Sequence, residues 1–203
     1  MNAAVLWTGG KDCCLAMHEA INQGFHINLL VTFVPIEGDF EAHPLSVMKQ
    51  QAEAMGLHHL EIPIEPPYKE NYTSAIRLLE RQVEWLITGD IDLVDGLPNW
   101  IRECCEETQM NVLTPLWQQP RRLLLDKLLS YQIEAHISYI KSPYIDCTWI
   151  NRKIDRQCIE DLEELNEKYG VDPCGENGEY HSIVVNSPLF RNKLAALFNK
   201  RNC

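Results

Sequence analysis

The sequence predicts an α/β fold with a doubly wound parallel sheet and a small C-terminal α+β domain. Short apolar runs alternate with helical patterns through the first half of the chain, and this alternation is typical of a parallel sheet covered by helices. After Pro115-Leu116-Trp117 the alternation stops, and a glycine-rich loop precedes a last short strand. We therefore expect two domains, residues 1–118 and residues 119–203, which pack directly on each other and share a cleft.

The first domain contains five predicted strands and four predicted helices. The strands are the apolar runs at residues 3–7, 27–34, 60–64, 85–88 and 111–113. The helices cover residues 12–23, 44–55, 70–83 and 99–109. Gly24 and Gly56 supply the end signals of the first two helices. The apolar residues of the second helix lie on one stripe, at Leu45, Met48, Ala52 and Met55.

The second domain is predicted to contain two helices and two strands. The helices cover residues 120–131 and 154–169, and the strands cover residues 134–140 and 182–185. An aromatic-rich irregular stretch lies at residues 144–149, and the glycine-rich loop lies at residues 170–178. An amphipathic tail follows the last strand.

The composition is that of an ordinary globular protein with a formal net charge of -11. Because nucleic-acid binders are normally basic, this charge argues against a nucleic-acid partner. The eight cysteines include no C-x-x-C pair, so we expect reduced thiols in a cytoplasmic protein. No apolar run approaches the roughly 18 residues that a bilayer requires, so we expect no membrane insertion.

A glycine-rich segment, Thr8-Gly9-Gly10-Lys11-Asp12-Cys13, lies between the first predicted strand and the first predicted helix. Two glycines let the backbone turn sharply and approach an anion, and the N–H groups of the next helical turn point at it. Neither the P-loop pattern nor the dinucleotide-binding pattern can be read here. The segment therefore predicts a phosphate-binding loop of another kind, and the alternative is a mere tight turn.

Charged residues at this loop and at the end of the fourth strand predict a metal-assisted phosphate site. Lys11 suits a phosphate, unless it is only a solvated lysine. Asp12 would repel a triphosphate, and a Mg²⁺ ion between them removes the conflict. Asp90, which follows Gly89 at the carboxyl end of the fourth strand, faces the same crevice in a parallel sheet, unless it caps the next helix. We predict Lys11, Asp12 and Asp90 as catalytic residues, with Asp12 and Asp90 as metal ligands.

The residues at positions 8–13 resemble the S-G-G-x-D-S pyrophosphate loop of the ATP pyrophosphatases, which adenylate a substrate and release pyrophosphate. The resemblance implies that Thr8, Gly9, Gly10, Lys11, Asp12 and Cys13 bind ATP. Thr8 keeps the hydroxyl of the first serine, but Cys13 replaces the second serine with a weaker hydrogen-bond donor. Because a thiol at a helix N-terminus tends to have a lowered pKa, a reactive thiolate is an alternative role for Cys13.

Further motifs, spread over essentially the whole chain, resemble those of the diphthine-ammonia ligase family. They are Thr88-Gly89-Asp90-Ile91, Pro115-Leu116-Trp117, residues 149–155 and Gly175-Glu176-Asn177-Gly178-Glu179-Tyr180. The resemblance implies an adenine nucleotide alpha hydrolase-like sheet of the HUP type. It also implies a ligase reaction in which ATP activates a carboxylate that ammonia then attacks, with release of AMP and pyrophosphate.

The same resemblance implies the partners. Residues 1–118 would be the ATP-binding pyrophosphate-loop domain, and residues 119–203 the substrate-binding domain. We expect ATP and Mg²⁺, ammonia that arrives free or from a partner, and a second copy of the chain in a homodimer. If the organism makes diphthamide, the carboxylate belongs to a modified histidine of a translation elongation factor. Two alternatives stay open: adenylation of a small carboxylate or a tRNA base, and a non-catalytic ATP sensor.

The family's ligand contacts map onto residues in both domains. His43 and Gly89 fall in the nucleotide site, although His43 could equally serve as an N-cap substitute before Pro44. The predicted substrate contacts are Trp149, Arg152, Glu176, Gly178, Glu179, Tyr180 and His181.

Several of these substrate contacts have a second interpretation. Glu176 and Glu179 suit a cationic substrate or ammonium, or they are charges of a loop held by its glycines. His181, at a position where the family usually has an acidic residue, could be a base for ammonium or a surface residue. Trp149 and Arg152 suit stacking on a flat or cationic ligand, or packing in the core.

Overall fold

The computed structural model describes residues 1–36, 44–93 and 100–194. Its centre is a parallel sheet with the strand order β3-β2-β1-β4-β5. The strands are β1 (Asn2–Leu6), β2 (His26–Pro35), β3 (His58–Ile64), β4 (Trp85–Ile87) and β5 (Asn111–Leu113). The predicted doubly wound sheet is confirmed. Because the strand order reverses between β1 and β4, the ligand crevice of such a sheet lies at the carboxyl ends of these two strands.

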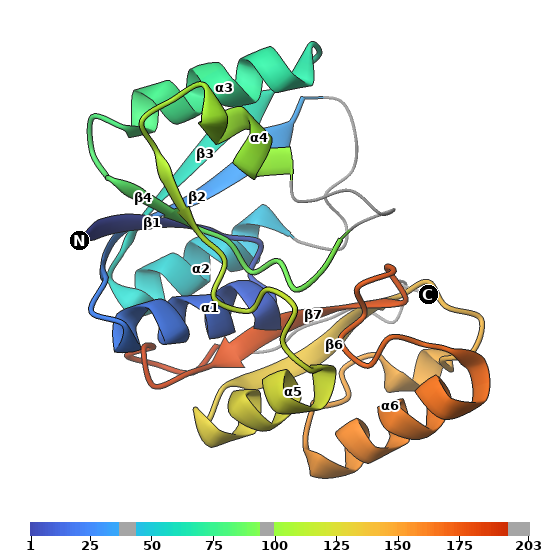
Figure 1. Ribbon diagram of the computed structural model, residues 1–203. Coiled ribbons are helices and arrows are strands. Elements are labelled where there is room, and N and C mark those ends of the chain that lie inside the picture. Colours follow the sequence, from blue (N-terminus) through green and yellow to red (C-terminus); the bar gives the residue numbers. More distant parts are fainter. Residues whose placement is uncertain (37–43, 94–99, 195–203) are drawn as a thin grey trace.

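Helices cover both faces of this sheet (Figure 1). The helices are α1 (Lys11–Asn22) and α2 (Leu45–Met55) on one face, and α3 (Tyr68–Leu79) and α4 (Trp100–Glu106) on the other. Each face has its own apolar core. Along β1, Ala3 and Val5 enter the core on the α1 side and Ala4 enters the core on the α3 side, because successive strand residues face opposite sides.

The C-terminal part adds a second sheet and two helices to the α1 face. Its elements are α5 (Arg121–Ser130), β6 (Glu134–Ile140), the short 3₁₀ helix η1 (Cys147–Trp149), α6 (Arg156–Tyr169) and β7 (Tyr180–Asn186). β6 and β7 pair antiparallel, and β7 runs beside α1 (Figure 1). The N–H of Val184 donates to the carbonyl oxygen of Gly9 at 2.9 Å. A strand near the end of the chain is therefore a direct neighbour of the loop that precedes α1.

The ends of the C-terminal elements follow local chemistry. α6 begins after Asp155, whose carboxylate accepts a hydrogen bond from the N–H of Cys158 at 3.0 Å, and it ends at Gly170 in the left-handed conformation. β7 begins at Tyr180, earlier than predicted, because Tyr180 and His181 pair with Ile140 and Tyr139 of β6. The last residue of the Gly175 to Tyr180 motif therefore belongs to strand β7.

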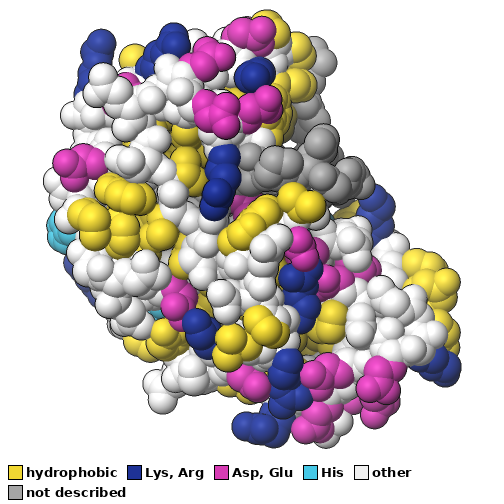
Figure 2. Space-filling view, viewed as in Figure 1, with side chains coloured by type: hydrophobic (Ala, Val, Ile, Leu, Met, Phe, Trp, Pro, Cys, Tyr) yellow, Lys and Arg dark blue, Asp and Glu magenta, His cyan; other side chains and the backbone are white. Residues whose placement is uncertain are grey.

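Charges of both signs are interspersed over the face of the molecule in Figure 2. On α5, Arg122 pairs with Asp126 at 3.0 Å and with Glu163 of α6 at 2.6 Å. The positive charge of Arg122 is therefore balanced by acidic neighbours, in agreement with the acidic net charge.

Six described cysteines are free and buried, as expected for reduced thiols. Cys147 departs from this expectation because it is disulfide-bonded. Within residues 1–36, 44–93 and 100–194, no helix is long and apolar enough to cross a membrane.

Candidate functional site

Residues 8–13 form the turn from β1 into α1. Gly9 has a φ of 78°, which side chains other than glycine rarely adopt. A Cβ atom at Gly9 would lie 2.7 Å from Oε1 of Gln51, so the position has no room for a side chain either. Gly10 gives α1 no side-chain cap. The N–H groups of the first turn of α1 therefore depend on partners from elsewhere.

The buried side chain of Gln51, on α2, holds this turn in place. Its Oε1 accepts a hydrogen bond from Nε1 of Trp7 at 2.9 Å. Its Nε2 donates to the carbonyl oxygens of Gly9 at 2.9 Å and Val184 at 2.8 Å. One amide thus joins the end of β1, the loop and β7. Gln51 could not be predicted from the sequence, because nothing in its local sequence marks a buried glutamine.

Lys11 is 3% exposed, so the interpretation as a solvated lysine is wrong. Its Nζ pairs with the carboxylate of Asp12 at 2.8 Å, donates to the carbonyl oxygen of Cys174, and lies 5.5 Å from the centre of the Tyr180 ring. Burial by itself would lower the pKa of Lys11, but the neighbouring Asp12 reverses this effect and the pKa lies well above its usual value. The site therefore contains a buried, permanent positive charge.

A cavity of about 220 Å³ opens beside Lys11 between the loop and β7. Residues from the two ends of the chain line it: Thr8, Gly10, Lys11 and Asp12, and Cys174, Gly175, Glu176, Gly178, Tyr180, His181 and Ser182. The structure therefore brings the glycine-rich motif of the C-terminal part onto the loop at residues 8–13.

A second cavity of about 310 Å³ extends toward the end of β4. Thr8, Asp12 and Glu176 line both cavities, and the second is also lined by Cys13, Thr88, Gly89 and Asp90. Burial raises the pKa of Asp90. Asp90 does not cap a helix, since the described residues that follow it, 91–93, are not helical. The two cavities share three lining residues, and together they form the candidate site around Asp12.

Gly89 allows the end of β4 to approach the loop closely. A Cβ atom at Gly89 would lie 2.7 Å from the backbone of Asp12 and of Cys13, closer than side chains can come. The glycine is therefore required by packing between β4 and the first turn of α1.

Glu176 gives the site a carboxyl group that titrates near neutral pH. Burial raises its pKa to about 7, and the charge of Asp12 adds to this effect. His181, which also contacts the ring of Tyr139, has a pKa lowered by burial and then by Lys11 and Lys141. His181 is partly buried and lines the cavity, and its lowered pKa favours the neutral form at neutral pH.

Cys13 is 4% exposed and does not have the environment of a reactive thiolate. Its thiol donates to the carbonyl oxygen of Gly10 at 3.2 Å and accepts from the hydroxyl of Thr8 at 3.7 Å. Burial raises its pKa in spite of its place at the helix N-terminus. The alternative of a reactive thiolate is wrong.

Among the described residues, four of the predicted site residues line neither cavity: Gly9, Trp149, Arg152 and Glu179. The carboxylate of Glu179 accepts from the N–H groups of Asp172 at 2.8 Å and Asn177 at 3.0 Å, so it holds its own loop. The guanidinium of Arg152 lies 4.1 Å from the ring centre of Trp149 and pairs with Asp161 of α6. The prediction for His43 lies outside the described residues.

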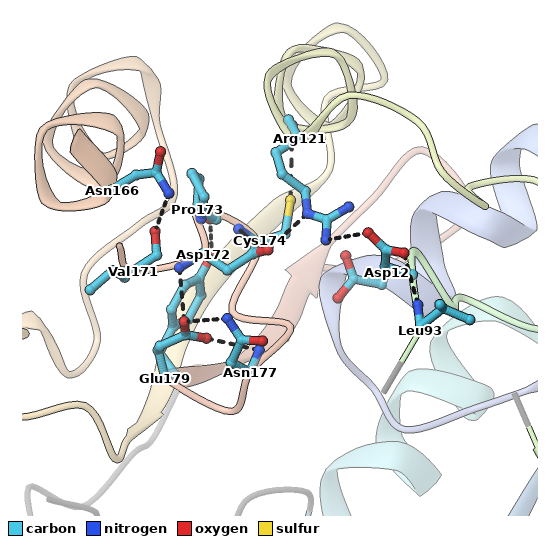
Figure 3. A network of polar contacts seen from close by, with 12 residues as sticks. Asp12, Leu93, Arg121, Asn166, Val171, Asp172, Pro173, Cys174, Asn177 and Glu179 are labelled. Atoms are coloured by element: carbon cyan, nitrogen blue, oxygen red, sulfur yellow. Dashed lines mark hydrogen bonds and ion pairs between the residues drawn. The ribbon is translucent and has the colours of Figure 1, made fainter. Parts of the chain in front are cut away.

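Arg121 fixes the C-terminal loop over the site and was not predicted from the sequence. From the start of α5 its guanidinium pairs with Asp172 at 2.9 Å and with Asp92, in the loop after β4, at 3.1 Å. Figure 3 shows this guanidinium between the C-terminal loop and Asp12. The carboxylate of Asp172 also accepts from the N–H of Cys174 at 2.7 Å. These contacts fix the backbone around Cys174, whose carbonyl oxygen accepts the hydrogen bond from Nζ of Lys11.

Metal binding by the protein alone is not supported by the described part of the chain, which has no group of three or more His, Cys, Asp or Glu side chains arranged to hold an ion. Asp12 and Asp90 line one cavity, which suits an ion that shares its ligands with a bound phosphate.

Comparisons with known proteins match the chain over most of its length. The family described as Diphthamide synthase N-terminal domain matches residues 1–112, and Diphthamide synthase C-terminal domain matches residues 121–202. Diphthine-ammonia ligase of Mus musculus is 27% identical over 225 residues, and that of Homo sapiens is 28% identical over 220 residues. Each alignment covers 96% of this chain and 82% of the relative.

A solved structure shares the fold. It is described as a predicted subunit of tRNA methyltransferase from Methanocaldococcus jannaschii, and it matches 93% of this chain and 98% of its own with a TM-score of 0.50. At 19% identity, this likeness concerns the architecture alone.

Proposed function

The chain belongs to the diphthamide synthase family, and we propose that it is an ATP-dependent ligase of the diphthine-ammonia ligase type. In this proposal it adenylates a carboxylate and transfers ammonia to it, with release of AMP and pyrophosphate. The observation that carries the proposal is the cavity lined both by the loop at residues 8–12 and by residues 174–182. Within this site, residues 1–118 would bind ATP and residues 119–203 would bind the acceptor.

The loop and Lys11 would bind the outer phosphates of ATP. The N–H groups at the start of α1 point their dipoles toward the loop, and the buried ammonium of Lys11 adds a full positive charge. Asp12 and Asp90 would hold Mg²⁺, because this ion is usually bound by one or two carboxylates together with substrate phosphates. When bound, the ion neutralises the charge that develops on the leaving pyrophosphate.

The proposed reaction has two steps. In the first, an oxygen of the acceptor carboxylate attacks the α-phosphorus of ATP, an O–P bond forms, and the bond from that phosphorus to pyrophosphate breaks. In the second, the nitrogen of ammonia attacks the acyl carbon, a C–N bond forms, the C–O bond to AMP breaks, and the nitrogen loses a proton.

Glu176 is the group best suited to take the proton from the nitrogen. Its pKa of about 7 means that a substantial fraction of the carboxyl is ionised at neutral pH, and it lines both parts of the site. The neutral imidazole of His181 lies in the same cavity as a second acceptor. Both groups are positioned by the C-terminal motif, on the side where the acceptor would enter.

The acceptor is the modified histidine of a translation elongation factor if the organism makes diphthamide. A different carboxylate is the alternative acceptor, since His181 replaces an acidic residue of the family pattern. The acidic net charge of -11 supports a protein or small-molecule acceptor over tRNA.

The proposal is tested by incubating the purified chain with ATP, Mg²⁺, ammonium and an acceptor, and by measuring AMP and pyrophosphate. Elongation factor carrying the unamidated histidine is one acceptor, and a panel of small carboxylates is a parallel arm. AMP should accumulate only when acceptor and ammonium are both present. Saturable ATP binding without AMP in any mixture would contradict the enzyme and support a nucleotide sensor.

A further inference from the structure

The side chain of Ser182, on β7, caps α1 from the far end of the chain. The N–H of Lys11 donates to Oγ of Ser182 at 3.2 Å, across a separation of 171 residues. Ser182 is 4% exposed. Since Gly10 cannot cap α1 with a side chain, Ser182 supplies an acceptor for one of the N–H groups of the first turn that have no partner within the helix.

The hydroxyl of Ser182 still has a proton to donate. A serine hydroxyl can accept and donate at the same time, and here the accepted bond comes from Lys11. No acceptor for the hydroxyl proton is found among residues 1–36, 44–93 and 100–194. Ser182 lines the cavity of about 220 Å³ together with Thr8, Lys11 and Asp12. Its O–H can therefore donate to an anion in that cavity.

The loop at residues 8–13 has the hydroxyl of Thr8 but no second hydroxyl. Cys13 stands at the last position of the pyrophosphate-loop pattern, and its thiol is directed at the carbonyl oxygen of Gly10. It does not line the cavity beside Lys11. A thiol is also a weaker donor than a hydroxyl. Cys13 therefore leaves an anion in this cavity without the hydrogen bond that a serine could give.

We propose that Ser182 supplies the hydroxyl that donates to the pyrophosphate portion of ATP, in place of the second serine of the loop. The inference rests on the proposed function, because it assigns the phosphates to the cavity beside Lys11. It makes β7 part of the nucleotide site, so that residues 119–203 contribute to ATP binding as well as to acceptor binding.

The test compares the affinity of four full-length proteins for Mg²⁺-pyrophosphate and for Mg²⁺-ATP by titration calorimetry. They are the wild type, Ser182→Ala, Ser182→Thr and Ser187→Ala. Ser182→Ala should bind pyrophosphate about tenfold more weakly, since a hydrogen bond to a charged group is lost. Ser182→Thr keeps the hydroxyl and should stay within about twofold of the wild type.

Ser187→Ala is the matched control, because Ser187 lies just beyond the same strand. Its hydroxyl is also buried, accepts from the N–H of Leu189 at 3.1 Å, and contacts Nε2 of His18 at 3.0 Å. This variant should lose stability but keep its affinity for pyrophosphate. An equal loss of affinity in Ser182→Ala and Ser187→Ala would overturn the proposal, because it would indicate a purely structural effect.

The outcomes separate this inference from the proposed function. If the wild type binds neither pyrophosphate nor ATP, the proposed function itself fails. If the wild type binds both and Ser182→Ala binds them equally well, only the assignment of Ser182 fails. Should Ser182→Ala not fold, Ser182→Cys keeps the size of the side chain with a weak donor, and an affinity equal to that of Ser182→Thr would refute the proposal.

Discussion

The side-chain amide of Gln51 donates to the carbonyl oxygen of Gly9 at 2.9 Å, and so ties α2 to the turn between β1 and α1. The same nitrogen donates to Val184 of β7 at 2.8 Å. Because these groups are buried, each would be costly to leave without a partner. The shape of the phosphate loop therefore depends on one amide that also fixes the second sheet.

Replacing Gln51 by Met should destabilise the protein while keeping most of the side-chain volume. The indole of Trp7 would lose its acceptor and the carbonyl oxygens of Gly9 and Val184 would each lose one hydrogen bond, so we expect a loss of about 2–4 kcal/mol in the free energy of unfolding. Urea unfolding measures the free energy of unfolding of each variant. Gln50→Met is the control, since Gln50 is exposed on the same helix. Equal stability of the two variants would contradict the role of Gln51.

Gly9→Ala and Gly24→Ala separate backbone strain from the need for space. Both glycines have left-handed backbones, with φ of 78° and 86°, so both variants should lose about 1 kcal/mol or more of stability. Only Gly9 has a close neighbour, because nothing lies within 4 Å of a Cβ atom at Gly24. Gly9→Ala should therefore also lose ATP affinity, by at least tenfold, whereas Gly24→Ala should not. Calorimetric titration with ATP would refute this if both variants bound alike.

Glu176→Gln should flatten the pH dependence of stability. A carboxyl whose pKa is raised on folding from 4.5 to about 7 contributes stability that is present below about pH 4.5 and is lost as the pH rises through about 7. Glutamine does not titrate, so the variant should gain up to about 3 kcal/mol over the wild type between pH 5 and pH 8.

Urea unfolding at several pH values measures this difference. Glu164→Gln is the control, since Glu164 is an exposed residue of α6. If the free energies of unfolding of the wild type and of Glu176→Gln changed with pH in parallel, Glu176 would not be buried beside Asp12. That result would contradict the structure of the site.

Contiguous features of this site could be predicted from the sequence. The residues at 8–13 follow one another along the chain, so the glycines, the lysine and the carboxylate identified the loop before its surroundings were known. The strands of the sheet were found for a similar reason, since Ala3, Ala4 and Val5 form a continuous apolar run buried on both faces.

Features that depend on distant contacts could not be predicted. Gln51, Arg121 and Ser182 act on residues far away in the sequence, and no local pattern distinguishes them from surface polar residues. Trp149 and Arg152 are predicted to contact a ligand, but in the structure the guanidinium of Arg152 lies over the ring of Trp149. For Cys13, the helix-terminus rule predicted a lowered pKa, and burial has the larger and opposite effect.

The carboxylates of Asp12 and Asp90 are proposed to hold Mg²⁺. Asp12→Asn keeps an oxygen beside the buried Lys11 but removes a negative charge that would face the phosphates. Without magnesium, the variant should bind ATP more tightly than the wild type, because a repulsion is gone. With magnesium the order should reverse, since a ligand of the ion is lost, and we expect affinity at least about tenfold weaker than in the wild type. Asp90→Asn should give the same reversal, and Asp126→Asn, an ion-paired residue of α5, should give none. Titrations with ATP, in the presence and absence of Mg²⁺, measure these affinities. An equal fall in ATP affinity in both conditions would indicate a disturbed loop, and Asp12 and Asp90 would then not be ligands of the metal.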